Sequence, residues 1–199
     1  MKKLYFIMLA TVVTLTSCLS ENDESQKLII DPVNWLAAQF QFKSDTLETF
    51  PHYVFNSAEE IQKYLVGNGW KHEASFAIKE DGSVEQKPYY EEMDGVSPID
   101  YYFNDANTLT EFFYSDAEAG KLVSKTHKWA YIENESVISI DPLISATPAP
   151  RIMQILEAKE RTMTVVQLIG FRGQDGKPLY AVSIYAKMTA KELNEKLSR

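Results

Sequence analysis

Histidines are the first side chains to consider for metal binding or acid–base chemistry, and the chain has three, His52, His72 and His127. A helical metal site needs two ligands on one face, as in a His-Glu-x-x-His motif. The three histidines are far apart in the sequence, and the single cysteine can form neither an internal disulfide nor a cysteine-based zinc cluster. We therefore expect no metal site and a structural role for each histidine.

Catalytic nucleophiles and paired carboxylates are the next candidates. The chain lacks a Gly-x-Ser-x-Gly elbow and a glycine-rich phosphate loop followed by Lys-Ser/Thr. Its densest acidic cluster is Glu91, Glu92 and Asp94, which is typical of a solvated turn. A glycosidase pair would need one carboxyl group held in an apolar pocket. The sequence thus predicts a protein that is not an enzyme and that needs no cofactor.

Cys18, the only cysteine, follows a recognisable pattern at the start of the chain. Lys2 and Lys3 precede an apolar run from Leu4 to Leu15, which has the length of a signal-peptide core and is too short to span a bilayer. The sequence Leu-Thr-Ser-Cys at 15–18 resembles the lipobox of bacterial lipoproteins. This resemblance implies lipidation of the Cys18 thiol and cleavage before it, so residues 1–17 are the expected signal peptide. The alternative is an ordinary secretory signal that contains a cysteine.

Residues 18–30 are the expected tether, and its stretch 19–27 is polar, with acids at Glu21, Asp23 and Glu24. One interpretation is a solvated acidic tether between a lipid anchor and a folded domain. The other is a resemblance to the acidic export signal of lipoproteins of the Bacteroidota, which implies transport to the outer face of the cell. Both predict an outer-membrane lipoprotein of the cell envelope, attached to the membrane by acylated Cys18. They leave open whether the protein faces the periplasm or the exterior.

Composition and charge predict a single globular domain over residues 31–199. The chain has 199 residues, of which 45% are hydrophobic and 24% charged, so it can bury a sizeable core. The net charge is −8, with 28 acidic and 20 basic residues and no basic cluster. A nucleic-acid surface needs a concentrated positive field, so we expect no nucleic-acid partner. Anionic lipid repels an acidic domain, which makes the acyl group the expected means of attachment.

Helix signals occur at the two ends of this domain. Residues 31–68 form the expected helical N-terminal segment. Its clearest helix begins with a capping box, Ser57 with Glu60, and ends near Gly67. A second capping box predicts a C-terminal helix over 189–199.

Between residues 69 and 188 the apolar residues repeat with the period of two that is typical of β-strands. Short strands follow one another without intervening helices, which favours antiparallel neighbours over a βαβ sheet. We therefore expect a mainly β fold with flanking helices, in which an antiparallel meander forms the body. The expected strands are 74–78, 99–103, 108–115, 122–132, 137–141, 152–157, 162–169 and 179–187.

This meander carries short motifs in a fixed order. They are Gly-x-Gly-Trp at 67–70, a strand that ends in Asp-Gly at 76–82, Tyr-x-Phe at 101–103, Lys-Trp-x-Tyr at 128–131, Val-Ile-Ser-Ile at 137–140, and a hairpin that pairs 152–156 with 163–168. Together they resemble the small lipocalin-like lipoproteins of the Bacteroidota. The resemblance covers about residues 60–188 and implies a small lipocalin-like barrel or half-barrel without catalytic residues.

Aromatic side chains are dense between Tyr89 and Tyr131. Neighbouring residues of a strand point to opposite faces, so one set of aromatics fills the interior while the other is covered or exposed. We expect Trp129, midway along its strand, to be a core anchor. The candidate ligand contacts are Trp129, Tyr131, His127, Tyr101 and Phe103.

Two functions are consistent with these patterns. The first is a lipid-anchored, non-enzymatic binding module that holds a small apolar molecule or a glycan, since barrel interiors and aromatic rings bind such ligands. The second is an accessory lipoprotein that docks on another envelope protein and takes no small molecule. A cavity in the barrel would favour the first function, and a packed interior with an exposed aromatic patch would favour the second.

Overall fold

The computed structural model describes most of the residues beyond position 56 and a few before it. The described residues are 40–43, 46–47, 55, 57–89, 98–115, 120–132, 137–140, 151–172 and 176–199. Several sequence predictions lie outside these ranges. They are the signal peptide, Cys18, the acidic tether and residues 31–39 of the expected helical N-terminal segment.

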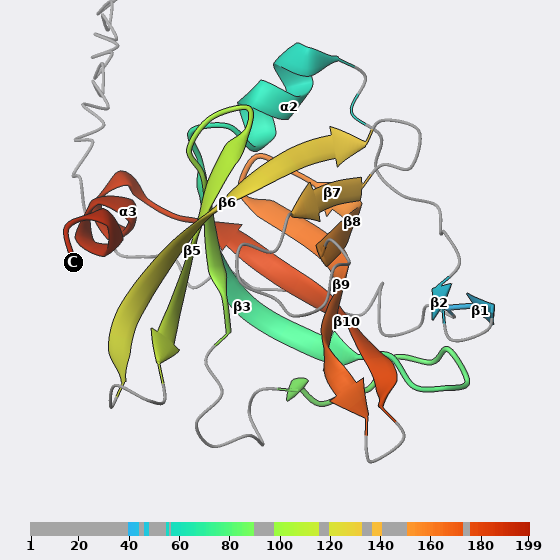
Figure 1. The fold of residues 1–199 in the computed structure, drawn as a ribbon. Coiled ribbons are helices and arrows are strands. Elements are labelled where there is room, and N and C mark those ends of the chain that lie inside the picture. Colours follow the sequence, from blue (N-terminus) through green and yellow to red (C-terminus); the bar gives the residue numbers. More distant parts are fainter. Residues whose placement is uncertain are drawn as a thin grey trace, which may run out of the picture. The chain divides into compact units, whose positions relative to one another are not determined.

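A closed barrel of antiparallel strands forms the body of the domain (Figure 1). Each strand is paired with the next one along the chain, and the last strand, β10, pairs with the first, β3. This is the up-and-down architecture that lipocalins have. The strands are β3 (Gly69–Ala77), β4 (Asp100–Phe103), β5 (Thr108–Ser115), β6 (Lys121–Ile132), β7 (Val137–Ile140), β8 (Arg151–Ala158), β9 (Thr162–Arg172) and β10 (Lys177–Lys187).

This topology confirms the expected mainly β fold, an antiparallel meander that closes into a small lipocalin-like barrel. The ring is complete, so the barrel and not the half-barrel is correct. The wall is nevertheless uneven, because β3 pairs with β4 only through Gly69 and Trp70. Beyond Trp70 a side chain replaces the backbone pairing between the two strands. The Asp100 carboxylate accepts a 2.7 Å hydrogen bond from the backbone N–H of His72.

Alternating burial along the strands shows why these sequences form a barrel. In β6, His127 and Trp129 are buried while Lys128 and Ala130 are exposed, as the period of two predicts. The middle of β10, residues 181–185, is buried on both faces, so its apolar run does not alternate.

Two described helices flank the barrel. Helix α2 (Ala58–Tyr64) starts at Ser57, whose hydroxyl accepts a 3.2 Å hydrogen bond from the backbone N–H of Glu60. Helix α3 (Ala190–Leu197) starts with the expected capping box between Thr189 and Glu192. Figure 1 shows α2 above one end of the barrel and α3 beside the outer face of its wall. Both helices lie where the sequence predicts them.

The N-terminal segment also contains β-structure. Strands β1 (Phe42–Lys43) and β2 (Thr46–Leu47) form a separate antiparallel ribbon. The segment 31–68 is thus only partly helical among the residues that the structure describes.

Candidate functional site

One end of the barrel, where β3 begins and β10 ends, is filled by apolar side chains; we call it the closed end. The Phe55 ring lies 6.1 Å from Tyr64 of α2 and 5.2 Å from Tyr131 of β6. Leu65, directly after α2, is fully buried in the same core. The helix and its flanking aromatics therefore seal this end.

Trp129 and Phe103 lie inside this packed region. Their rings meet edge to face at 4.9 Å, and the indole Nε1 donates a 3.0 Å hydrogen bond to the carbonyl oxygen of Asp105. Trp129 is only 5% exposed, so the expectation that its face points inward is confirmed. Its surroundings are those of a core residue.

His127 lies next to Trp129 on the inner face and faces a carboxylate. Its Nε2 is 3.1 Å from Oε2 of Glu111, and both side chains are buried. A buried imidazole and carboxylate at this distance form an ion pair when the imidazole is protonated. The pair therefore accounts for two polar side chains in an otherwise apolar wall.

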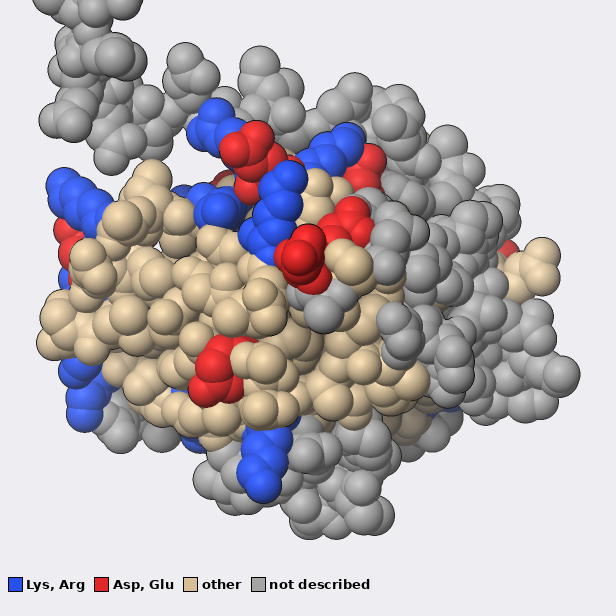
Figure 2. Space-filling model, turned by 90° about the horizontal axis from the view of Figure 1, so that it is seen from above, with Lys and Arg blue, Asp and Glu red and all other residues tan. Residues whose placement is uncertain are grey.

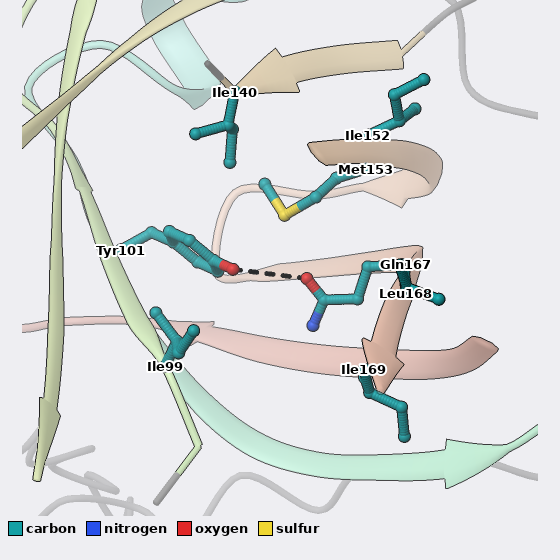
Figure 3. Close-up of a pocket in the computed structure, with 8 residues that line it drawn as sticks. All are labelled: Ile99, Tyr101, Ile140, Ile152, Met153, Gln167, Leu168 and Ile169. Carbon is teal, nitrogen blue, oxygen red and sulfur yellow. Dashed lines mark hydrogen bonds between the residues drawn. The ribbon is translucent and has the colours of Figure 1, made fainter. Parts of the chain in front are cut away.

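The opposite end of the barrel, which we call the open end, contains a cavity of about 90 Å³. Its lining comes from Ile99 just before β4, the first residues of β4 and β8, the last residue of β7 and the middle of β9. Figure 3 shows Tyr101, Ile140, Met153 and Gln167 converging on the cavity, whereas Ile152 and Leu168 lie to one side. The full lining is Ile99, Tyr101, Ile140, Ile152, Met153, Gln167, Leu168 and Ile169.

Gln167 links this cavity to a network of buried polar side chains, the polar network. Its Nε2 donates hydrogen bonds of 3.0 Å to Ser183 Oγ and 2.8 Å to the Tyr185 hydroxyl. Ser183 Oγ lies 2.7 Å from Ser75 Oγ, which in turn lies 2.7 Å from Nε2 of His72. On the cavity side, Gln167 Oε1 accepts a 3.4 Å hydrogen bond from the Tyr101 hydroxyl. The cavity therefore has a mainly apolar lining with one polar contact, between Tyr101 and Gln167, which we call its polar floor.

An irregularity in β3 makes this network possible. Ser183 is paired with Ser75 and Tyr185 with His72, so two steps along β10 correspond to three along β3. The extra residue in β3 is a β-bulge. Without it, His72 and Ser75 would point to opposite faces, because they are three residues apart.

Burial changes the titration of His72. Desolvation lowers the pKa of its imidazole from 6.5 to about 4, so the ring is neutral at pH 7. Between pH 6.5 and about 4 the unfolded chain binds a proton on this ring that the folded barrel does not bind. We therefore expect the free energy of unfolding to decrease as the pH falls through this window.

Urea unfolding at pH 7 and pH 4.5 measures this effect, and His72→Gln is the matched variant because it can still hydrogen-bond to Ser75 without titrating. The variant should lose less stability than the wild type between the two pH values. Equal losses in the two proteins would contradict the assignment to His72.

The structure separates the residues that the sequence suggests as ligand contacts. Tyr101 lines the cavity, whereas Phe103 and Trp129 belong to the core and Tyr131 contacts Phe55 near the closed end. His127 faces Glu111. Gln167, Met153 and the aliphatic lining residues were not foreseen. The one sequence signal for Gln167 is a polar residue at an inward position between Val165 and Ile169 in an apolar strand.

Charged side chains are mixed in sign on the face shown in Figure 2. Basic and acidic residues lie close together there, and neither sign forms a continuous patch. Within the described ranges, no cluster of three His, Cys, Asp or Glu side chains could hold a metal ion. In the same ranges no helix has the length and apolar character needed to cross a membrane.

Comparisons with known proteins give a likeness of fold. No protein-family model matches the sequence, and the comparison with curated proteins gives no match. Among solved structures, bovine odorant binding protein with its natural ligand is 13% identical, with a TM-score of 0.36 over 65% of this chain and 76% of that chain. The same protein with a selenium-containing odorant is 14% identical, with a TM-score of 0.37 over 66% and 76%. These similarities are too weak to transfer a function to this chain.

Proposed function

We propose that this protein is a non-enzymatic binding module for a small apolar molecule, which it holds in the cavity at the open end of the barrel. The observation that carries the proposal is the cavity itself. Its walls are aliphatic and its polar groups are confined to the floor, where Tyr101 and Gln167 meet. Small-molecule sites commonly combine an apolar lining with a few placed polar groups.

The lining favours an apolar ligand over a glycan. A sugar presents several hydroxyl groups, each of which needs a hydrogen-bond partner once it is removed from water. The lining offers five aliphatic side chains and Met153 against one amide and one phenol. A glycan would therefore leave most of its hydroxyl groups without partners.

Cavity size limits the shape of the ligand. A cavity of roughly 150 Å³ holds a benzene molecule, whereas this one measures about 90 Å³. A slender alkyl chain fits such a space better than a ring does. A longer ligand would extend past Ile152 and Leu168, which are 45% and 38% exposed.

These exposed residues also bear on the second function, docking on another envelope protein. Ile152, Leu168 and Phe171 are the large exposed apolar residues of β8 and β9. Two of the three line the cavity. We therefore assign Ile152 and Leu168 to ligand binding, and protein docking is the weaker candidate.

Substitution of Ile99 by Trp tests the cavity. Ile99 lies before β4 at the cavity wall, and an indole there would occupy space that an alkyl ligand needs. Each CH₂ group excluded from the cavity costs ~0.8 kcal/mol, about fourfold in affinity, so the exclusion of two lowers the affinity more than tenfold. Fluorine NMR titration with 1-fluorohexane, a slender probe without a hydrogen-bond donor, measures this loss.

The matched control is Ile132→Trp, the same change at an exposed position of β6. This variant should bind 1-fluorohexane as the wild type does. If the wild type shows no saturable binding, or if both variants bind equally well, the cavity is not the ligand site.

We further propose that the module is anchored in the cell envelope by lipid on Cys18. This part of the proposal rests on the lipobox-like residues 15–18 and on the polar, acidic segment that follows them. A single acyl chain binds membranes only marginally, whereas two or more anchor a protein stably. The protein would then be an outer-membrane lipoprotein that holds its barrel next to a lipid surface.

A further inference from the structure

We infer that the ligand is a neutral alcohol, whose hydroxyl group binds between Gln167 Oε1 and the Tyr101 hydroxyl while its alkyl chain points toward the opening. This inference rests on the proposed function, because it identifies the chemical class of the ligand in the same cavity. It follows from the orientation of one amide, the geometry of one long hydrogen bond and the absence of charge in the lining.

The orientation of the Gln167 amide is set by the polar network. Both N–H bonds of Nε2 are directed away from the cavity, toward Ser183 and Tyr185. The Ser183 hydroxyl can then donate to Ser75, and the Ser75 hydroxyl to the neutral imidazole of His72. All donors thus point the same way along the network, and Gln167 presents its carbonyl oxygen to the cavity.

That carbonyl oxygen has unused capacity. An amide oxygen has two lone pairs, and the hydrogen bond from the Tyr101 hydroxyl is 3.4 Å long. The usual O–H···O distance is about 2.7–2.8 Å, so this contact is weak. A ligand hydroxyl beside Tyr101 can donate a hydrogen bond of ordinary length to the second lone pair of Gln167 Oε1.

The charge of the lining residues favours an alcohol over an ionised fatty acid as the ligand. None of the eight described lining residues is charged, and the floor presents an acceptor oxygen. An ionised carboxylate would lose its hydration without gaining a cation. The neutral ring of His72 at the far end of the network supplies no positive charge at pH 7 either.

The apolar walls determine how the rest of the ligand lies. Met153 and Ile140 stand over Tyr101 in Figure 3, and Ile169 lies beyond Gln167. An alkyl chain that begins at the polar floor would pass these side chains toward Ile152 and Leu168, which are the lining residues most exposed to solvent. The hydroxyl group therefore enters first and the chain end remains nearest to solvent.

Three probes of equal chain length test the inference at pH 7.5 in calorimetric titrations of the wild type: 1-hexanol, 1-fluorohexane and hexanoate. Fluorine replaces the hydroxyl with little change in size but cannot donate a hydrogen bond. We expect 1-hexanol to bind about tenfold more tightly than 1-fluorohexane, which corresponds to one well-formed hydrogen-bonding group. Hexanoate should bind most weakly.

Two variants locate the effect. Gln167→Met removes the acceptor and should lower the affinity for 1-hexanol to that for 1-fluorohexane, whereas Gln154→Met, the same change outside the lining, should keep the tenfold difference. Should Gln167→Met fail to fold, Tyr101→Phe, which removes one oxygen atom, decides the matter through a several-fold loss in affinity for 1-hexanol alone.

The failures of this inference and of the proposed function are distinguishable. Equal binding of 1-hexanol and 1-fluorohexane by the wild type would contradict the inference of an alcohol ligand, but it would still be consistent with an apolar ligand in this cavity. Tightest binding of hexanoate would also overturn it. If no probe binds to the folded wild-type protein, the proposed function itself is wrong.

Discussion

Replacement of Trp129 by alanine is expected to lower the free energy of unfolding by about 3–5 kcal/mol. The indole is 5% exposed, meets Phe103 edge to face at 4.9 Å and donates a hydrogen bond to the Asp105 carbonyl oxygen. Its removal leaves a cavity in the closed end and a buried carbonyl group without this donor. A typical domain is stable by about 5–15 kcal/mol, so the loss is a large part of the whole.

Urea unfolding followed by circular dichroism measures this change. Phe171→Ala is the matched control, because that aromatic side chain is 65% exposed and its loss should change stability by less than about 0.5 kcal/mol. An unchanged midpoint for Trp129→Ala would contradict the core assignment. Trp129, Tyr131 and His127 would then return as candidate ligand contacts.

Replacement of Cys18 by serine should abolish membrane attachment. A serine hydroxyl cannot form the thioether that the lipobox resemblance implies, and the acidic chain has no basic cluster to bind lipid instead. Metabolic labelling with palmitate, followed by detergent phase separation, measures the loss. The label should vanish, and the protein should move to the aqueous phase.

Ser17→Ala is the control for this experiment, since alanine keeps a small residue directly before the cysteine. It should be labelled and retained with membranes as the wild type is. Palmitate incorporation into Cys18→Ser at the wild-type level would show that the lipid is attached elsewhere or that the protein is not a lipoprotein of this kind.

The architecture could be predicted from the sequence because the alternation of apolar and polar residues along each strand indicates which face is buried. Alternation along β6 places His127 and Trp129 on one face, and the capping box at Thr189 marks the start of α3. These are local signals, each complete within about ten residues. The meander then follows from the order of the strands, since short connections favour antiparallel neighbours.

The polar network could not be predicted because it depends on a bulge. In a regular strand, His72 and Ser75 point to opposite faces, and nothing in their sequence context marks an extra residue between them. Ser183 lies on β10, which pairs with β3 only in the closed barrel, and Gln167 lies on the neighbouring strand β9. The network exists through pairings between residues distant in the sequence.

The cavity was beyond sequence reasoning for a related reason. It arises at the open end, where β4 and β7 are each only four residues long, so side chains from different strands enclose a space that none of them fills. The aromatics were expected to form such a site, but large rings pack against one another, as Phe103 and Trp129 do. Aliphatic residues near strand ends carry no comparable signal.

The pairing of β3 with β10 also determines when the barrel can form during synthesis. These strands are the first and the last of the barrel, so the final row of backbone hydrogen bonds must wait until β10 has left the ribosome. Until then β3 and β9 each present an edge of unpaired backbone groups, to which other chains can add. Contacts this distant in the sequence form slowly. A chain cut short before β10 is therefore an open sheet with two unpaired edges. The need for chaperone protection is then greatest in the interval before β10 is synthesised.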